Sequence, residues 1–196
     1  YTVNGLVKNH KVKAFITVKG IKNLAKNPGF ESGSITPWVV SSEGPSPIGI
    51  GNINENVHSG KRAMKYWLDS DFDATVEQEI SSLEDGSYLL RVWLMGESKG
   101  VSDIQLFAES GEDRYSTKAT VNGWNKWNLF ELKNIQVVNG KATIGMRINE
   151  KAESWGWIDD FMFIKNDAKA VIKVQEYAKS GSEFNAVVGV SGLMDP

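Results

Sequence analysis

The stretch WGWIDDFMFI, residues 155 to 164, decides how the rest of the chain is interpreted. It is a run of large apolar residues interrupted at its centre by two adjacent carboxylates, Asp159 and Asp160. A bounded apolar run of this kind predicts a buried strand. Burying a carboxylate without a partner is costly, so the pair is expected to hold something. The stretch therefore predicts a core strand that also contributes to a binding site.

Two upstream motifs supply further oxygen ligands. Glu31 lies in NPGFESG, after a glycine and an aromatic residue, and Ser59 and Lys61 flank a turn glycine in HSGKRA. A glutamate, turn carbonyls and a closing aspartate form an all-oxygen set, and calcium takes about six to eight oxygen ligands. We expect a structural calcium ion that joins the first and last strands of one domain, away from any ligand-binding face.

Composition narrows the class of protein. The chain has 196 residues, 41% of them hydrophobic, which suits one globular domain with attached pieces. A net charge of -2 without a basic run gives no footprint for nucleic acid or anionic lipid, so we expect neither as a partner. The chain has no cysteine, which excludes disulfides and Cys-zinc sites. No apolar run approaches the ~18 residues of a membrane span, and we expect a soluble piece of a longer, exported protein.

Alternation with period two runs through most of the sequence and predicts an all-β fold, an antiparallel β-sandwich of jelly-roll type. Strands are expected at 38–42, 48–53, 61–68, 72–80, 87–95, 101–109, 124–132, 135–138, 141–149 and 157–164. The sandwich is placed at 23–166. Residues 1–22 predict a hairpin, and 167–196 a strand segment or linker that could pair with it.

The alternation also predicts which side chains leave the core. In SYLLRVWLMG, for example, the apolar set from Tyr88 to Leu94 leaves Arg91 and Trp93 on the opposite side. Four strands of one sheet are expected to share a face that carries Trp67, Trp93, Lys65, Arg91, Gln105, Arg147 and Asn149. Flat aromatic rings surrounded by amide and guanidinium donors suit a sugar, which has an apolar C–H face and a rim of hydroxyls.

An ordered set of motifs across residues 24 to 165 resembles the family 61 carbohydrate-binding modules. The set comprises NPGFESG, HSGKRA, FDATVEQEI, LEDGSYLLRVWLMG, GWNKW, VVNGKATIGMRI and SWGWIDDF. Such modules are calcium-stapled jelly rolls attached to bacterial endo-β-1,4-galactanases. The resemblance implies binding of β-1,4-galactan or galacto-oligosaccharides without catalysis, on behalf of a galactanase catalytic domain in a secreted, extracellular protein that degrades the plant cell wall. The opening YTVNGLVKNHKVKAFITV is similar to the last strands of bacterial immunoglobulin-like repeats.

The resemblance also implies site residues. The calcium motif falls on Glu31 and Asp160 as side-chain ligands, with carbonyls near Gly29, Ser59 and Lys61. For the sugar it indicates Trp155 and Trp93, with Trp157 as a weaker candidate.

Several aromatic and charged residues also fit a purely structural role. Trp38, Trp124 and Trp127 are expected in the core or capping a sheet. Trp67 and Trp93 could instead pack under a loop, and Arg91 and Arg147 could form ordinary ion pairs with Asp103 or Glu77. His10 and His58 are too few to argue for a metal or acid–base pair.

Two further functional classes stay open. A jelly-roll hydrolase or lyase could use paired carboxylates such as Glu77 and Glu79, although nothing in the sequence indicates a cleft. An adhesion module could present the same tryptophans to a protein partner.

Overall fold

The computed structural model describes residues 22–51 and 56–166 in full, and the backbone of four further strands. The chain divides into two compact units, Ile21–Asp167 and the two chain ends together. In the latter, β1 (Thr2–Val3) pairs antiparallel with β14 (Ala186–Val187), and β13 (Val171–Gln175) with β2 (Lys13–Thr17). The expected pairing between the two chain ends is confirmed for these strands. The described strands β1 and β2 pair with C-terminal strands and not with each other, and the predicted turn of the N-terminal hairpin lies outside the described residues.

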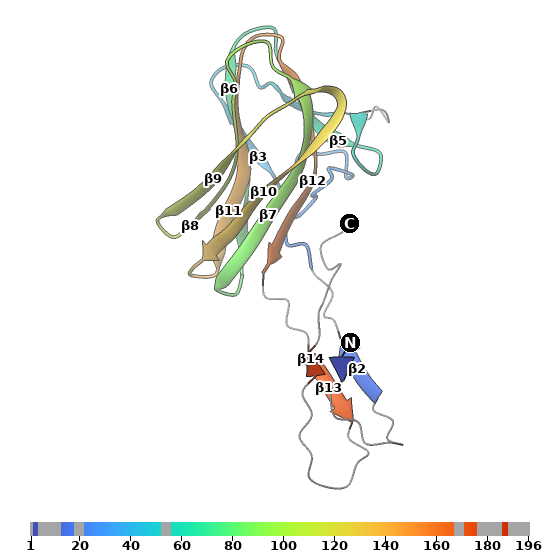
Figure 1. Cartoon of the computed structure of the whole chain (residues 1–196). Coiled ribbons are helices and arrows are strands. Elements are labelled where there is room, and N and C mark those ends of the chain that lie inside the picture. The colour runs from blue at the N-terminus through green and yellow to red at the C-terminus, as the bar shows by residue number, and fades with distance from the viewer. Residues whose placement is uncertain are drawn as a thin grey trace. The chain divides into compact units, whose positions relative to one another are not determined.

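The central unit is an antiparallel β-sandwich of two five-stranded sheets (Figure 1). Sheet I has the order β10-β7-β12-β5-β4 and sheet II the order β3-β6-β11-β8-β9. The strands are β3 (Val39–Ser42), β4 (Ile48–Gly51), β5 (Ala63–Trp67), β6 (Phe72–Ser81), β7 (Gly86–Glu97), β8 (Asp103–Ser110), β9 (Asp113–Ala119), β10 (Gly123–Val137), β11 (Lys141–Glu150) and β12 (Trp155–Lys165). The predicted fold class is confirmed. Within the described part of the chain, no helix is long and apolar enough to cross a membrane.

The predicted strands match the observed ones with two exceptions. The two segments expected at 124–132 and 135–138 are one strand, β10, with a shift of register between Leu132 and Ile135. Such a bulge inserts extra residues without ending the pairing. Strand β9 was not predicted, because it is an edge strand of sheet II with polar residues on both sides. An edge strand with little buried surface has no apolar alternation to detect.

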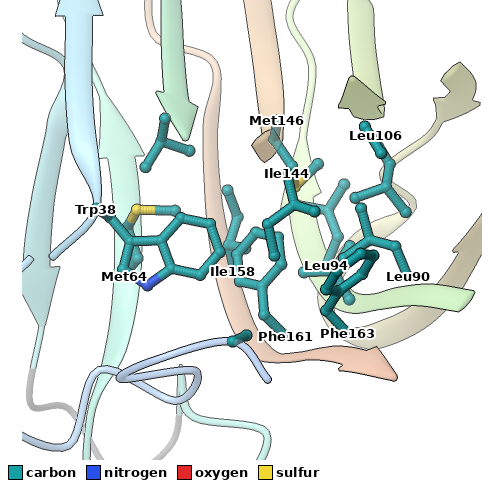
Figure 2. Packing of buried hydrophobic residues seen from close by; sticks show 14 of the residues in the cluster. Trp38, Met64, Leu90, Leu94, Leu106, Ile144, Met146, Ile158, Phe161 and Phe163 are labelled. Carbon is teal, nitrogen blue, oxygen red and sulfur yellow. The ribbon is translucent and has the colours of Figure 1, made fainter. Parts of the chain in front are cut away.

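The core lies between the two sheets and is made by the alternate residues that each strand turns inward. Leu90 and Leu94 of β7 face Leu106 of β8 and Ile144 of β11 (Figure 2). Trp38 is 4% exposed and its ring centroid lies 4.3 Å from that of Phe161, so its predicted place in the core is confirmed.

The segment before β3 is fastened along β12. Asn23 donates from Nδ2 to the carbonyl of Phe161 and accepts at Oδ1 from the amide of Phe163, while the amide of Phe161 donates to the carbonyl of Pro28. These bonds bring the NPGFE motif beside the DD pair, about 130 residues later in the chain. These hydrogen bonds position the candidate functional site.

Candidate functional site

The outer face of sheet I gathers tryptophans from four strands, and we name it the aromatic face. Trp155 of β12 pairs across the strands with Trp67 of β5, and Trp157 lies two residues further along, opposite Lys65 and Met95. Trp93 of β7 and Trp127 of β10 extend the face toward the other edge. Trp67, Trp93 and Lys65 point outward, as predicted, and all three lie on sheet I.

Part of the aromatic face forms a second, smaller core. Trp157 is 7% exposed and packs on Ala63 and Met95, with Val57, Trp127 and Trp155 partly buried around them. A β-carbon at Gly51 would collide with the ring of Trp157, so β4 passes over this ring only because it has a glycine there. Trp67 is 53% exposed at the margin. The face is therefore partly packed and partly open to a ligand.

Three of the predicted sugar-binding residues lie on the other sheet. Gln105 of β8 and Arg147 and Asn149 of β11 point outward from sheet II, so the expectation that all candidates share one face is wrong. Alternation separates inward from outward side chains, but it does not say to which sheet a strand belongs.

These three side chains belong to a network on the outer face of sheet II, which we name the ionic face. Arg147 donates from Nε to Asp73 Oδ1 at 3.0 Å and from Nη1 to Asp103 Oδ2 at 3.3 Å. Asn149 donates to Asp73, and Gln105 donates to Asp103. The alternative role for Arg147, an ordinary ion pair with Asp103, is confirmed. Arg91 on the aromatic face also forms an ion pair, with Glu131 at 2.5 Å.

The candidate cation site lies where β12 is irregular. The pairing of β12 with β7 shifts between Asp159 and Met162, and Asp160 has a positive φ of 50°. In a regular strand, neighbouring side chains point to opposite faces. The irregularity lets Asp159 and Asp160 both reach the segment from Asn56 to Arg62, which we name the bridging segment.

The carboxylates hold the bridging segment mostly through its backbone. Asp159 Oδ2 accepts from the amides of His58 at 2.9 Å and Ser59 at 3.2 Å. Asp160 Oδ1 accepts from Ser59 Oγ at 2.8 Å. Glu31 accepts from the amides of Lys61 at 2.7 Å and Arg62 at 2.9 Å. Gly60 lies between these contacts with φ 66°, and a β-carbon there would collide with the carboxylate of Glu31.

Two of these carboxylates, those of Asp159 and Asp160, lie beside Gly29. A β-carbon on Gly29 would lie 3.3 Å from Oδ1 of both Asp159 and Asp160, and 4.0 Å from Cγ of Glu31. Burial, followed by the charge of Asp160, raises the pKa of Asp159 to about 7. Hydrogen bonds from the Lys61 and Arg62 amides lower the pKa of Glu31. Among the described residues, neither Lys nor Arg forms an ion pair with Asp159 or Asp160.

This arrangement suits a hard cation in its donor chemistry. It places three carboxylates, from two segments of the chain, around the bridging segment, and oxygen ligands are what calcium takes. The described residues contain no group of three or more His, Cys, Asp or Glu side chains placed to hold a metal by themselves. Backbone carbonyls would therefore have to complete the ligand set, as the sequence predicts for Gly29, Ser59 and Lys61.

His58 joins the carboxylates to the aromatic face, a role that sequence reasoning missed. Its Nδ1 lies 2.7 Å from Asp160 Oδ2, and its ring stacks on Trp93 with centroids 4.0 Å apart and planes 16° apart. It also meets Trp127 edge-on at 5.5 Å. The expected separation between cation site and tryptophans is wrong at this point, and Trp93 packs beneath the bridging segment. The one sequence cue was the position of His58 directly before Ser59.

Two further tryptophans were expected in the core or capping a sheet, and only Trp127 has such a role. Trp124 is 57% exposed, so its predicted structural role in the core or as a cap of a sheet is wrong, and its Nε1 donates to Asn56 Oδ1 at 2.9 Å. Trp127 is half-buried, but it packs on the aromatic face and not between the sheets. Both lie where the pairing of β10 with β7 shifts, between Gly123 and Asn128. Such an irregularity redirects side chains that simple alternation would place in the core.

Comparisons with known proteins agree with the fold. No protein-family model matches the sequence, and no curated protein sequence matches it significantly. A family 16 carbohydrate-binding module is 13% identical with a TM-score of 0.56, over 73% of this chain and 100% of that one. The enzymatically active domain of tailspike protein 4 from bacteriophage CBA120 is 17% identical with a TM-score of 0.57, over 72% of this chain and 21% of that one. At these identities the likeness concerns the fold alone.

One solved structure is similar in sequence as well. It is TmCBM61 in complex with β-1,4-galactotriose, which is 32% identical to this chain with a TM-score of 0.68. The match covers 74% of this chain and 99% of TmCBM61, so a whole module is matched. The sandwich of this chain has a segment that carboxylates hold against a row of tryptophans. By its relationship to TmCBM61, the chain belongs to carbohydrate-binding module family 61.

Proposed function

We propose that the module binds β-1,4-galactan through the aromatic face, without catalysis. The observation that carries this proposal is the cross-strand pair of Trp67 and Trp155 on the outer face of sheet I, with Trp67 53% exposed. The relative TmCBM61 was solved with β-1,4-galactotriose. In the parent protein, which we propose is secreted by a bacterium, the module would target an attached galactanase to plant cell-wall polysaccharide.

The chemistry of this pair fits a sugar. A hexose ring stacks its C–H face on an indole, and its hydroxyls need polar groups at the edge of that ring. Lys65 is exposed on the same strand as Trp67, and Glu97 lies opposite Trp155. Glu97 accepts a hydrogen bond from Trp155, and its pKa is lowered chiefly by its hydrogen bond to Lys99. The pair thus has one charged group of each sign at its border.

Affinity for such a site is modest, because hydrogen bonds at an exposed surface mostly replace bonds to water. We expect dissociation constants between about millimolar and micromolar. Weak binding still helps an attached catalytic domain, because tethering raises its effective concentration at the polysaccharide.

A calcium ion at the carboxylates is the second part of the proposal. Glu31 and Asp160 would be its side-chain ligands, with carbonyls of Gly29, Ser59 and Lys61 completing an oxygen set. When bound, the ion supplies positive charge among carboxylates that otherwise repel one another. The protein's own part is to hold segments 23–31 and 56–62 against β12, through the hydrogen bonds of Asn23 and Asp159.

Isothermal titration calorimetry with galacto-, cello- and xylo-oligosaccharides tests the function. We expect heats of binding with the galacto series, little with the others, and no release of shorter sugars on prolonged incubation. Turnover would instead favour the hydrolase class, and no binding to any sugar would favour a protein ligand. Tighter binding to cello-oligosaccharides than to galacto-oligosaccharides would contradict the proposed specificity.

A further inference from the structure

Trp124 is exposed but held in place. Its side chain is 57% exposed, yet Nε1 donates to Asn56 Oδ1 at 2.9 Å. The next residue, Asn125, has φ 57°, and its amide lies 3.0 Å from the sulfur of Met95. The ring is thus fixed by its own hydrogen bond and by the backbone that follows it. A fixed, solvent-facing ring loses little conformational entropy when a ligand stacks on it.

Asn56 contacts Trp124, and two further asparagines, Asn122 and Asn128, flank it in the sequence. Asn56 accepts from the indole through Oδ1, and its amide nitrogen carries two N–H donors. Asn122 donates to Asn128 Oδ1 at 3.4 Å, and Asn128 donates to the carbonyl of Lys126 at 3.0 Å. Planar amides beside an exposed ring are suited to hydroxyl groups and not to an ionic ligand.

Trp124 lies on the same face as the Trp67–Trp155 pair. Asn56, which holds it, directly precedes Val57, and Val57 packs on the cluster of Ala63, Met95 and Trp157. The bridging segment therefore reaches across the aromatic face as far as β10.

Three of the open or half-open tryptophans lie next to one line of paired residues across the strands. Gly123 of β10 pairs with Gly96 of β7, Gly96 pairs with Gly156 of β12, and Gly156 pairs with Tyr66 of β5. Trp155 and Trp67 lie one residue to one side of this line, level with Glu97, and Trp124 lies one residue to its other side. Neighbouring strands are ~4.8 Å apart, so the line from β10 to β5 spans roughly 14 Å. That length exceeds one sugar ring and suits a short oligosaccharide.

We propose that Trp124, together with Asn56, forms an additional sugar subsite that takes a unit of the galactan chain beyond those at Trp67 and Trp155. This inference rests on the proposed function and deepens it. A polysaccharide lying across the strands would contact the Trp67–Trp155 pair with one part of its chain and the β10 edge with the next. The chemical class of the ligand is the same, a neutral β-linked hexose chain.

The test compares the wild type with Trp124→Ala by calorimetry, using β-1,4-linked galactose oligomers from the dimer to the pentamer. We expect the variant to bind the dimer as the wild type does and to lose about three- to tenfold in affinity for the longer oligomers. Asn56→Ala should show a smaller loss with the same dependence on length. Val39→Ala is the control, because Val39 is 58% exposed on sheet II and lies off the aromatic face.

Two patterns of affinity would overturn the inference. Equal affinities of wild type and Trp124→Ala at every length would show that Trp124 contacts no sugar. An equal loss at every length, dimer included, would show that Trp124 acts on the Trp67–Trp155 pair and not at a separate subsite. If the wild type binds no galactose oligomer, the proposed function itself fails, which the wild-type titration alone reveals. Melting temperatures of all variants, measured in parallel, identify any loss caused by unfolding.

Discussion

The two outer faces of the sandwich use similar residues in different ways. On the ionic face, Asp73 and Asp103 are about one-third exposed, and Arg147 forms an ion pair with each of them. On the aromatic face, Asp159 is fully buried, and backbone amides surround it in place of a basic side chain. The ionic face thus satisfies its own charges with side chains from the same sheet. The carboxylates at the aromatic face instead organise a separate segment, which is where a ligand site can be built.

This difference predicts that carboxylate substitutions have unequal costs on the two faces. Asp159→Ala removes the acceptor of the His58, Ser59 and Asp160 amides, and should lower the free energy of unfolding by about 3 kcal/mol, since unsatisfied buried groups are expensive. Asp73→Ala, on a half-exposed ion pair, should cost less than about 1 kcal/mol. Urea titration of both variants in the same buffer measures the two values. Equal costs would mean that the faces do not differ as described.

Calcium should act on one face only. An ion that binds the folded chain at Glu31 and Asp160 raises stability with the logarithm of its concentration, by about 2.7 kcal/mol at a hundredfold excess over its dissociation constant. Chelator should therefore lower the melting temperature of the wild type measurably. Glu31→Gln should remove most of this response, while Asp103→Asn, on the ionic face, should leave it intact. Identical melting curves in calcium and in chelator would contradict the ion site.

Sugar affinity is the sharpest measure of which face binds. Trp67→Ala and Trp155→Ala should each weaken binding of galacto-oligosaccharides by about 1 to 3 kcal/mol, because each removes an aromatic contact. Gln105→Ala and Asn149→Ala, on the ionic face, should leave the affinity unchanged. These four titrations decide between the aromatic face and the single mixed face that the alternation of the sequence favoured. A loss on substituting Gln105 together with none at Trp67 would reverse the assignment.

The sequence predicted the individual strands better than the way in which they pair into two sheets. The alternation in β5, β7 and β11 correctly separates Trp67, Trp93 and Arg147 from the core, because the side-chain direction is a local property of a strand. It does not place β8 and β11 in a different sheet from β5 and β7, because sheet membership depends on long-range pairing. The irregularities at Asp160 and Asn125 were invisible for the same reason. They are left-handed positions occupied by Asp and Asn, which adopt this conformation more readily than other non-glycine residues but are also common in ordinary turns and on strand faces, so the residue type alone does not mark them.

The candidate site shows the same limit. Glu31 and Asp160 both hold the bridging segment, Glu31 through the amides of Lys61 and Arg62 and Asp160 through Ser59, while their role as calcium ligands stays a prediction. The contribution of His58 was missed because a single histidine in a turn has no pattern of its own. Its role depends on Trp93, which is distant in the sequence and comes under its ring only in the folded sheet.

His58 offers a way to test whether the two parts of this region act together. His58→Ala removes both the stack on Trp93 and the bond to Asp160, and should cost about 1 kcal/mol in stability and weaken sugar binding slightly. His58→Phe keeps a ring over Trp93 but has no Nδ1. His58→Phe should therefore keep the packing on Trp93, so that any remaining loss is due to the missing bond to Asp160. Denaturation and calorimetry on both variants separate the contributions. If the alanine variant behaves as wild type in both, the bridging segment does not depend on this residue.

The smallest effect is expected within the ionic face itself. Arg147 is 36% exposed and bonds Asp73 and Asp103, and hydrogen bonds to Asp73 are the main cause that raises the pKa of Arg147. Because solvent screens such pairs, a double-mutant cycle of Arg147→Ala with Asp73→Ala should give a coupling energy of about 0.5 kcal/mol at low salt. At ~1 M salt the Debye length falls to ~3 Å, and the coupling should shrink further. No member of the cycle should change sugar affinity, because the network lies on sheet II. A coupling that stays large in high salt would mean that the pair is more shielded from solvent than its exposure indicates. A change in sugar affinity would mean that the ionic face does contact the polysaccharide.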